Sequence, residues 1–383
     1  MEFYEKYGIK PLINASETYT NLGGSLMDSR TIEAMKEAGN GFVDLEELLD
    51  KVCNKAAKLT NNEGAFITTG AAGGVILTAA ASIIMANAKD KAYEALLDIF
   101  PNLSSMQRNE ILVFDGKFLD SIPYWKLIKL TGAKIIKVKP DEDSIRAAIN
   151  EKTAAFFLFP STLYETGIMT CEEAIPIIKE MNTTVIVDAA AQLPPKENLW
   201  YYTTKLGADA VIFSGGKHLK GPQCTGLIAG KKEITTLCRK LASPNARIGR
   251  AFKTGKEELA GFITALEIFV KTDTEDRFKQ QEAILSYVSE TLKKKTGLST
   301  VLQNRGRLGT YQPLLIGLLP EGLTAAECNE YARKCEVPVD LGVYQTEFKK
   351  PDNMFFINAY NLQPFEAEAV INAIAGFLNL KGK

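Results

Sequence analysis

Short, almost wholly apolar runs alternate with longer segments of helical periodicity through the first two thirds of the chain. Strands that are buried on both faces have this pattern, because neither face needs polar side chains. We therefore expect an α/β fold in which helices cover both faces of a mostly parallel sheet. Residues 225–230 follow the last of these runs too closely for a helical crossover and are expected to pair antiparallel. The predicted parallel strands span residues 64–69, 111–114, 134–138, 154–159, 184–188 and 209–214.

The helical pattern divides the chain into parts. The apolar stretch 75–88 is too short to span a bilayer and is bounded by glycines and charges, so we interpret it as a buried helix. A long amphipathic stretch, 256–295, leads into an α+β pattern of short strands and two helices. We expect an N-terminal arm (1–30), a large domain (31–255), a connecting long helix (256–295) and a small C-terminal domain (296–383).

The composition limits the classes of molecule that the protein is expected to bind. The chain has 383 residues and a formal net charge of −1, so it has no broad basic field to attract nucleic acid or anionic lipid. Its six scattered cysteines form no C-x-x-C pair, and its N-terminus lacks the basic and apolar segments of a secretion signal. We expect a cytoplasmic protein that binds neither nucleic acid nor membrane. The one histidine, His218, argues against a multi-histidine metal site, and no metal is expected.

The segment FSGGKHLKGPQ places Lys217 directly after two glycines, at the end of a predicted buried strand. A lysine desolvated at such a place has a lowered pKa, and its free amine condenses with an aldehyde. Gly215 and Gly216 permit backbone angles that are barred to other residues, and Gly221-Pro222 ends the turn. A solvated lysine in a glycine-rich turn is the alternative interpretation.

Asp188 ends the predicted strand TVIVD, at the carboxyl edge of the sheet, where ligands of open α/β folds bind. A carboxylate there can keep a pyridine nitrogen protonated, and the protonated ring of pyridoxal phosphate is an electron sink. The separation from Lys217, 217 − 188 = 29 residues, is about what one strand–helix–strand unit requires. Both residues would then leave the same edge of the sheet. An aspartate that caps the next helix is the alternative.

Residues 68–74, TTGAAGG, join a predicted strand to the apolar helix. Small residues let backbone N–H groups approach a phosphate, and a helix N-terminus favours its negative charge. Close helix packing by small residues explains the segment about as well. Ser214, three residues before Lys217, is placed to donate a hydroxyl to the same phosphate. Together, a phosphate cup, a proton-holding acid and an amine are far more specific than any one of them.

The chain resembles the SelA-like branch of the fold-type I pyridoxal-phosphate enzymes, which contains L-seryl-tRNA(Sec) selenium transferase and D-glucosaminate-6-phosphate ammonia-lyase. The resemblance implies a mostly parallel large domain, a smaller C-terminal α+β domain, pyridoxal 5′-phosphate as cofactor, and a homodimer or higher homo-oligomer. It runs from about residue 12 to residue 267 and rests on LINASETYTNLGGS (12–25), EGAFITTGAAGG (63–74), VIVDAAAQLPP (185–195), LGADAVIFSGGKHLKGPQCTGLIAG (206–230) and RIGRAFKTGKEELAG (247–261).

Carried over onto this sequence, the resemblance implies that Lys217 is the Schiff-base lysine and that Asp188 faces the pyridine nitrogen. Arg247 and Arg250 are candidates for a substrate carboxylate or phosphate, because guanidinium forks suit oxyanions. Ordinary surface or interface arginines are equally compatible with the pattern. His218 follows the lysine and is a candidate to point into the substrate site. The cofactor site would be completed by Thr69, Gly70, Ala71, Ser214 and Gln192.

The resemblance favours a lyase that eliminates water and ammonia from an amino-sugar acid similar to D-glucosaminate 6-phosphate, giving a 2-oxo acid. Lyase-like members carry a Gly-His-Arg segment that is absent from residues 114–134, where Phe118 or Tyr124 would supply a stacking ring instead. A selenium or sulfur transferase or an aldolase acting on a seryl-type substrate, a racemase, and a non-catalytic binder are the alternatives. The transferase has an additional tRNA-gripping N-terminal domain, for which we expect no room before residue 12.

Overall fold

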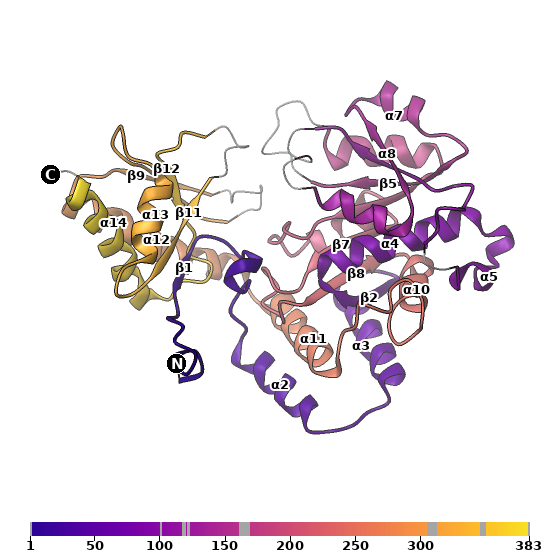
Figure 1. The fold of residues 1–383 in the computed structure, drawn as a ribbon, viewed down its shortest axis with the longest axis horizontal. Helices are drawn as coiled ribbons and strands as arrows, with labels where there is room; N and C mark the ends of the chain where they lie inside the picture. The colour runs from indigo at the N-terminus through magenta and orange to yellow at the C-terminus, as the bar shows by residue number, and fades with distance from the viewer. Residues whose placement is uncertain are drawn as a thin grey trace. The chain divides into compact units, whose positions relative to one another are not determined.

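The chain divides into two compact units in the computed structural model, Ser25–Thr272 and a smaller unit that combines Met1–Gly24 with Asp273–Lys383 (Figure 1). The segment expected as one connecting helix is two helices, α11 (Lys256–Lys271) and α12 (Thr274–Thr296). Asp273 starts the second helix, because its carboxylate accepts hydrogen bonds from the first free N–H groups of α12. The structure describes residues 2–99, 102–116, 120, 123–160, 169–304, 312–344 and 350–381.

Within the described residues, the large unit contains a seven-stranded sheet in the order β2-β8-β7-β6-β5-β3-β4. The strands from β7 to β4 run parallel, whereas β8 is antiparallel to both of its neighbours. The predicted mostly parallel sheet and the antiparallel segment 225–230 are thereby confirmed. The strands are β2 (Gly64–Thr69), β3 (Glu110–Phe114), β4 (Lys134–Val138), β5 (Thr153–Leu158), β6 (Thr184–Asp188), β7 (Ala210–Ser214) and β8 (Thr225–Gly230).

Helix α4 (Gly70–Asn87) is the buried helix that the apolar stretch predicts, and it packs against β2 and β5 to β8. It is the one described helix that is long and apolar enough to cross a membrane by length and composition, but two thirds of it is buried inside this unit. Small residues allow the close packing, since a Cβ on Gly74 would lie 2.8 Å from Cγ2 of Ile212. The helix follows β2 directly, and its first residues approach Gly226 of β8.

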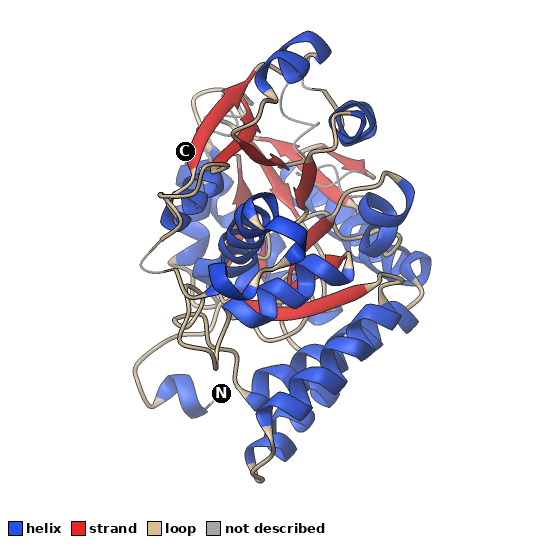
Figure 2. Ribbon diagram, turned by 90° about the vertical axis from the view of Figure 1, so that its right-hand side faces the viewer, coloured by secondary structure: helices blue, strands red, loops and turns tan. Residues whose placement is uncertain are grey.

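Other helices of the large unit lie on both sides of the sheet in the two ribbon views (Figures 1 and 2). Those near the N-terminal part pack on one another, because α11 contacts both α2 and α3. The remaining helices are α2 (Ser29–Gly39), α3 (Leu45–Leu59), η2 (Lys89–Lys91), α5 (Glu94–Leu97), η3 (Tyr124–Thr131), α7 (Glu142–Ala148), α8 (Cys171–Glu180), α9 (Asn198–Trp200), η4 (Tyr201–Lys205) and α10 (Lys232–Leu241).

The smaller unit has a sheet of its own, which in the described residues has the order β1-β11-β12-β10-β9. Its first strand comes from the N-terminus and pairs parallel with β11, where the hydroxyl of Ser16 donates to Asp340 at 2.5 Å. This strand was not expected from the sequence. The elements are α1 (Glu2–Glu5), β1 (Ile13–Ala15), η1 (Thr20–Leu22), β9 (Thr300–Gln303), β10 (Leu314–Leu318), α13 (Ala325–Arg333), β11 (Val339–Val343), β12 (Met354–Ile357), η6 (Pro364–Glu366) and α14 (Ala367–Lys381), in addition to α12.

Candidate active site

Strands β6 and β7 are parallel neighbours, and they end at the same edge of the large sheet. Asp188, the last residue of β6, is in register with Ile212 of β7. The pairing continues one residue further, because the N–H of Ala189 donates to the carbonyl of Ile212 at 2.9 Å. Lys217 follows the end of β7 by three residues. The carboxylate and the amine singled out in the sequence therefore belong to adjacent strand ends.

Asp188 has an unusual electrostatic environment. Burial raises its pKa from the ordinary value of 3.8 to about 6, while the N–H of Ala190 and the charge of Lys217 act in the opposite direction. The Ala190 N–H donates to this carboxyl at 3.1 Å. Lys217 is thus near enough for its positive charge to act on Asp188. A carboxyl that has lost hydration in this way is stabilised as an anion by any further positively charged N–H group that it meets.

Tight backbone contacts shape the turn that carries Lys217. The N–H of Gly215 donates to the carbonyl of Thr225 at 2.8 Å, which ties the start of the turn to β8. A Cβ on Gly216 would lie only 2.4 Å from Cα of Gln223, so a larger residue would force the two sides of the turn apart. The glycines before the lysine are therefore required by packing. They leave the Lys217 side chain half-buried at the sheet edge.

The start of α4 lies beside the end of β7, with Gly226 of β8 between them. Gly226 is in register with Ser214, and a Cβ placed on it would lie 2.4 Å from the carbonyl carbon of Gly70 and 2.7 Å from the nitrogen of Ala71. Thr69 is the N-cap residue of the helix, and Gly70 has a left-handed φ of +63°. Gly70 and Ala71 thus lie at a helix N-terminus, where unpaired N–H groups favour an anion, and Ser214 lies across Gly226 from them. Their contact with a phosphate stays a prediction.

Gln192 lies in the turn that follows β6. Its N–H donates to the carbonyl of Ala189 at 2.9 Å, and its side-chain amide donates to the carbonyl of Pro160 at 3.3 Å. Pro160 follows the end of β5, so Gln192 bridges the ends of two neighbouring strands at the edge where Asp188 lies. The structure therefore brings Gln192 to the same edge, and its predicted contact with the cofactor ring stays a prediction.

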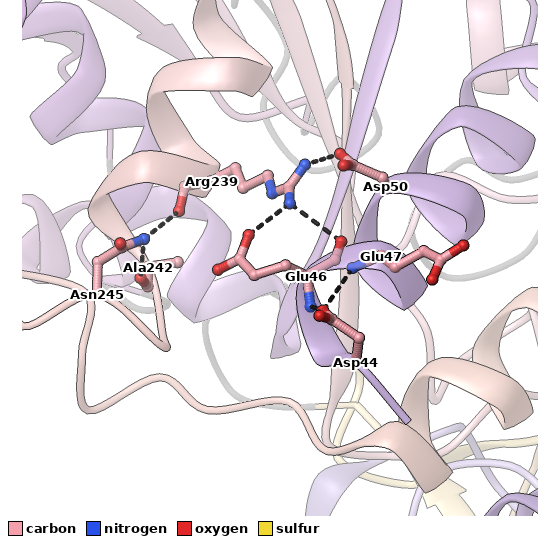
Figure 3. A network of polar contacts seen from close by, with 7 residues as sticks. All are labelled: Asp44, Glu46, Glu47, Asp50, Arg239, Ala242 and Asn245. Carbon is pink, nitrogen blue, oxygen red and sulfur yellow. Dashed lines mark hydrogen bonds and ion pairs between the residues drawn. The ribbon is translucent and has the colours of Figure 1, made fainter. Parts of the chain in front are cut away.

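The loop that carries Arg247 and Arg250 is anchored by α10. Figure 3 shows the guanidinium group of Arg239 between the carboxylates of Glu46 and Asp50, the first of which it contacts at 2.7 Å. The side-chain amide of Asn245 donates to the carbonyl of Ala242 at 3.2 Å, where the helix has ended. These contacts attach the end of α10, and the loop beyond it, to the start of α3.

Arg247 is engaged within this loop region. Its Nε donates to Asp98 at 2.8 Å, and its guanidinium also donates to the carbonyl of Lys240 at 3.1 Å. Arg250 is exposed and donates to the hydroxyl of Ser243 at 3.4 Å. Among the residues that the structure describes, neither arginine bonds to a member of the group around Lys217. Their contact with a substrate oxyanion stays a prediction.

His218, the candidate for the substrate site, and Phe118 and Tyr124, the candidate stacking rings, differ in position. His218 lies in the Lys217 turn but is only 4% exposed, so its ring is enclosed by protein. Tyr124 is 53% exposed on η3. Phe118 lies outside the described residues. The ring that would stack on the cofactor therefore stays unassigned.

Two residues near the site were not found from the sequence. Ser25 bonds to the backbone of the Lys217 turn, with its hydroxyl 2.6 Å from the carbonyl of Lys217 itself. The hydroxyl of Thr254 lies 3.4 Å from that of Thr69 at the start of α4. Both contacts join segments more than 180 residues apart, and no local pattern signals such a contact. A serine after two glycines and a threonine before a helix are the only traces in the sequence.

This group of residues fits pyridoxal phosphate. A helix N-terminus suits the phosphate, a carboxyl with a raised pKa suits the protonated pyridine nitrogen, and an amine next to that carboxyl suits the aldehyde. The fit rests on the geometry around Asp188 and α4, and on the effect of Lys217 on the carboxyl.

Comparison with known proteins identifies relatives. A family model described as L-seryl-tRNA selenium transferase matches residues 141–308. D-glucosaminate-6-phosphate ammonia lyase of Salmonella typhimurium is 30% identical over 292 residues, which cover 75% of this chain and 75% of that protein. A 5′-C-glycyluridine monooxygenase-decarboxylase of Streptomyces sp is 28% identical over 386 residues, which cover 98% of this chain and 92% of that protein.

Solved structures agree on the fold. The structure of D-glucosaminate-6-phosphate ammonia-lyase superposes with a TM-score of 0.82 at 24% identity, covering 100% of this chain and 99% of that chain. A pyridoxamine-pyruvate aminotransferase from Mesorhizobium loti superposes with a TM-score of 0.58 at 15% identity, covering 98% and 94%. The sheet order, the site at its edge and the similarity to the ammonia lyase lead to one conclusion: the chain belongs to the SelA-like family of fold-type I pyridoxal-phosphate-dependent enzymes.

Proposed function

We propose that this protein is a lyase that releases ammonia from an amino-sugar acid similar to D-glucosaminate 6-phosphate and leaves a 2-oxo acid. The observation that carries the proposal is the pairing of Asp188 and Lys217 at adjacent strand ends, in a chain 30% identical to an ammonia lyase. Such a pair offers a base for proton removal from an amino acid and a charge partner for a protonated cofactor ring.

In this proposal, Lys217 is the group that accepts and donates protons. Its amine, once free, accepts the α-proton of the substrate and returns a proton to the β-hydroxyl, which leaves as water. Hydrolysis takes the water up again, so the net products are one 2-oxo acid and one ammonia. When bound, pyridoxal phosphate supplies a sink for the electron pair that is released with the α-proton.

Asp188 would determine how strongly the bound cofactor attracts the electron pair released with the α-proton. In the free protein its carboxyl has a pKa of about 6 because burial removes hydration. Asp188 would pair with the protonated pyridine nitrogen of bound pyridoxal phosphate, and the two opposite charges would stabilise each other. Thr69, Gly70, Ala71 and Ser214 would hold the phosphate at the start of α4.

The proposal is tested on the purified protein loaded with pyridoxal phosphate. Wild-type protein should show a cofactor absorbance band, and borohydride should fix the cofactor to Lys217, as located by peptide mass spectrometry. Lys217→Ala should lose both signals, whereas Lys220→Ala, in the same turn, should keep them. D-glucosaminate and its 6-phosphate should then yield 2-oxo acid and ammonia in equal amounts. Failure with every amino-sugar acid, despite a bound cofactor, contradicts the lyase assignment.

A second candidate is oxygen-dependent decarboxylation. The relative named as a monooxygenase-decarboxylase aligns with 98% of this chain, whereas the ammonia lyase aligns with 75%. Either reaction would begin with an amino acid bound at the site of Lys217 and Asp188. Oxygen uptake with release of carbon dioxide, in place of ammonia alone, would favour this second candidate.

We also propose a homo-oligomer in the cytoplasm that does not bind tRNA. The net charge of −1 supports the last point. Retention on tRNA at physiological salt would favour a transferase acting on a seryl-type substrate. Absence of any cofactor band would favour the non-catalytic alternative.

A further inference from the structure

Ser25 lies against the backbone of the turn that carries Lys217. Its N–H donates to the carbonyl of Gly216 at 2.9 Å. Its Oγ lies 2.6 Å from the carbonyl oxygen of Lys217 and 3.1 Å from that of Gly216. A serine hydroxyl has one proton to donate, so the shorter contact, to Lys217, receives it. One residue from a distant part of the chain thus bonds to two successive carbonyls of the turn.

The Lys217 carbonyl is also held from within the turn. The N–H of Lys220 donates to it at 3.0 Å, so this oxygen accepts two hydrogen bonds from two directions. On the strand side, Gly215 is tied to Thr225 at 2.8 Å. The peptide plane of Lys217 is therefore fixed on both sides. Among the hydrogen bonds named here for the described chain, only those of Ser25 come from outside residues 215–225.

The position of the Lys217 backbone decides where its amine can reach. Asp188 is on a strand that is paired on both sides, whereas Lys217 is on a turn beyond the last ladder pair. Of the two residues, Lys217 consequently has more freedom to move than Asp188. A displacement of about 1 Å between reacting groups can lower a rate about 100-fold.

We propose that Ser25 is a positioning residue that holds the backbone of Lys217 so that its amine reaches the cofactor and the substrate. The proposal rests on the proposed function in one respect, namely that Lys217 is the reacting amine. The hydrogen bonds named here between Ser25 and this turn all go to the backbone of the turn. Its hydroxyl acts through the carbonyl to which it donates.

The test compares Ser25→Ala with Ser25→Thr, which keeps the hydroxyl, and with Ser29→Ala as a matched control. Ser29 is an exposed serine four residues further on, at the start of α2. Three quantities are measured: the rate at which added pyridoxal phosphate attaches to Lys217 in the apoprotein, kcat and KM, and the thermal midpoint of the apoprotein. The attachment rate is read from the absorbance band and checked by borohydride fixation.

Ser25→Ala should slow attachment and lower kcat by about tenfold, with KM changed by less than about threefold. Ser25→Thr should recover most of both rates, and Ser29→Ala should match wild type. Attachment and kcat at wild-type values in Ser25→Ala overturn the proposal. So does a loss of activity that is explained entirely by a lower thermal midpoint, with normal kcat for each occupied site.

Two further arms keep the result interpretable. If Ser25→Ala does not fold, Ser25→Cys retains the size but is a poor donor, and a wild-type attachment rate in that variant overturns the proposal. If wild-type protein never attaches the cofactor to Lys217, the proposed function fails, and the positioning role fails with it. If wild type attaches the cofactor but Ser25→Ala is indistinguishable from it, only the positioning role is refuted.

Discussion

Replacing Asp188 by asparagine should stabilise the apoprotein, in a way that depends on pH. The folded pKa of about 6 lies above the ordinary value of 3.8, because burial disfavours the charged carboxylate. Above pH 6, folding the ionised aspartate therefore costs about 3 kcal/mol relative to a neutral side chain. Asparagine has nearly the same shape, can accept the same Ala190 N–H bond and carries no charge, so this cost disappears.

The pH profile distinguishes this explanation from a general packing effect. Below about pH 3 the carboxyl is protonated in both states, and the substitution should have little effect. Between pH 4 and pH 6 only the unfolded chain releases its proton, so the wild-type apoprotein loses stability as the pH rises. The advantage of Asp188→Asn should be about 1.5 kcal/mol at pH 5 and about 3 kcal/mol at pH 8.

The assay is urea unfolding of both apoproteins at several pH values from 5 to 8, followed by the same measurement with pyridoxal phosphate. With the cofactor bound, the advantage of Asp188→Asn should shrink by about 1.4–2.7 kcal/mol, because neutral asparagine offers no charge to a pyridine N–H⁺. Cofactor affinity should then fall about 10- to 100-fold. A stability difference that does not grow between pH 5 and pH 8 would refute the assigned pKa. Unchanged cofactor affinity would refute the role of Asp188.

Three further predictions concern the packing of Gly226, the buried carboxylate of Asp209 and the cysteines. Gly226→Ala should destabilise the protein by about 1–3 kcal/mol and weaken cofactor binding, because its Cβ would push against Gly70; urea unfolding and a cofactor titration check this. Asp209→Ala should cost about 1–3 kcal/mol in urea unfolding, because the buried N–H of Val185 loses an acceptor at 2.7 Å. A disulfide reagent at pH 8 should modify the exposed Cys224 first, whereas the four buried cysteines, whose pKa burial raises, should react only on unfolding.

Much of the large unit could be predicted because its strands are short, apolar and buried on both faces. The predicted bounds of the strand that ends at Asp188 match the structure at both ends, and those of the strand that ends at Ser214 differ by one residue. The features that were missed depend on partners distant in the chain. The strand Ile13–Ala15 has three residues and pairs with β11 more than 300 residues later. The break before Asp273 was hidden because helical periodicity continues on both of its sides.

The groups that act on any bound amino acid differ from those that select one reaction. Asp188, Lys217 and the start of α4 are proposed to bind the cofactor, hold charge and move protons, and none of these roles by itself distinguishes a lyase from an oxygen-dependent decarboxylase. A substrate can lose its hydroxyl, lose carbon dioxide or react with oxygen. Which of these occurs depends on how the carboxylate or phosphate groups of the substrate are held at the site. In the free chain Arg247 is engaged with Asp98. Reaction specificity must therefore come from groups that bind the substrate outside this shared core, so variants of Asp188 and Lys217 alone cannot reveal it.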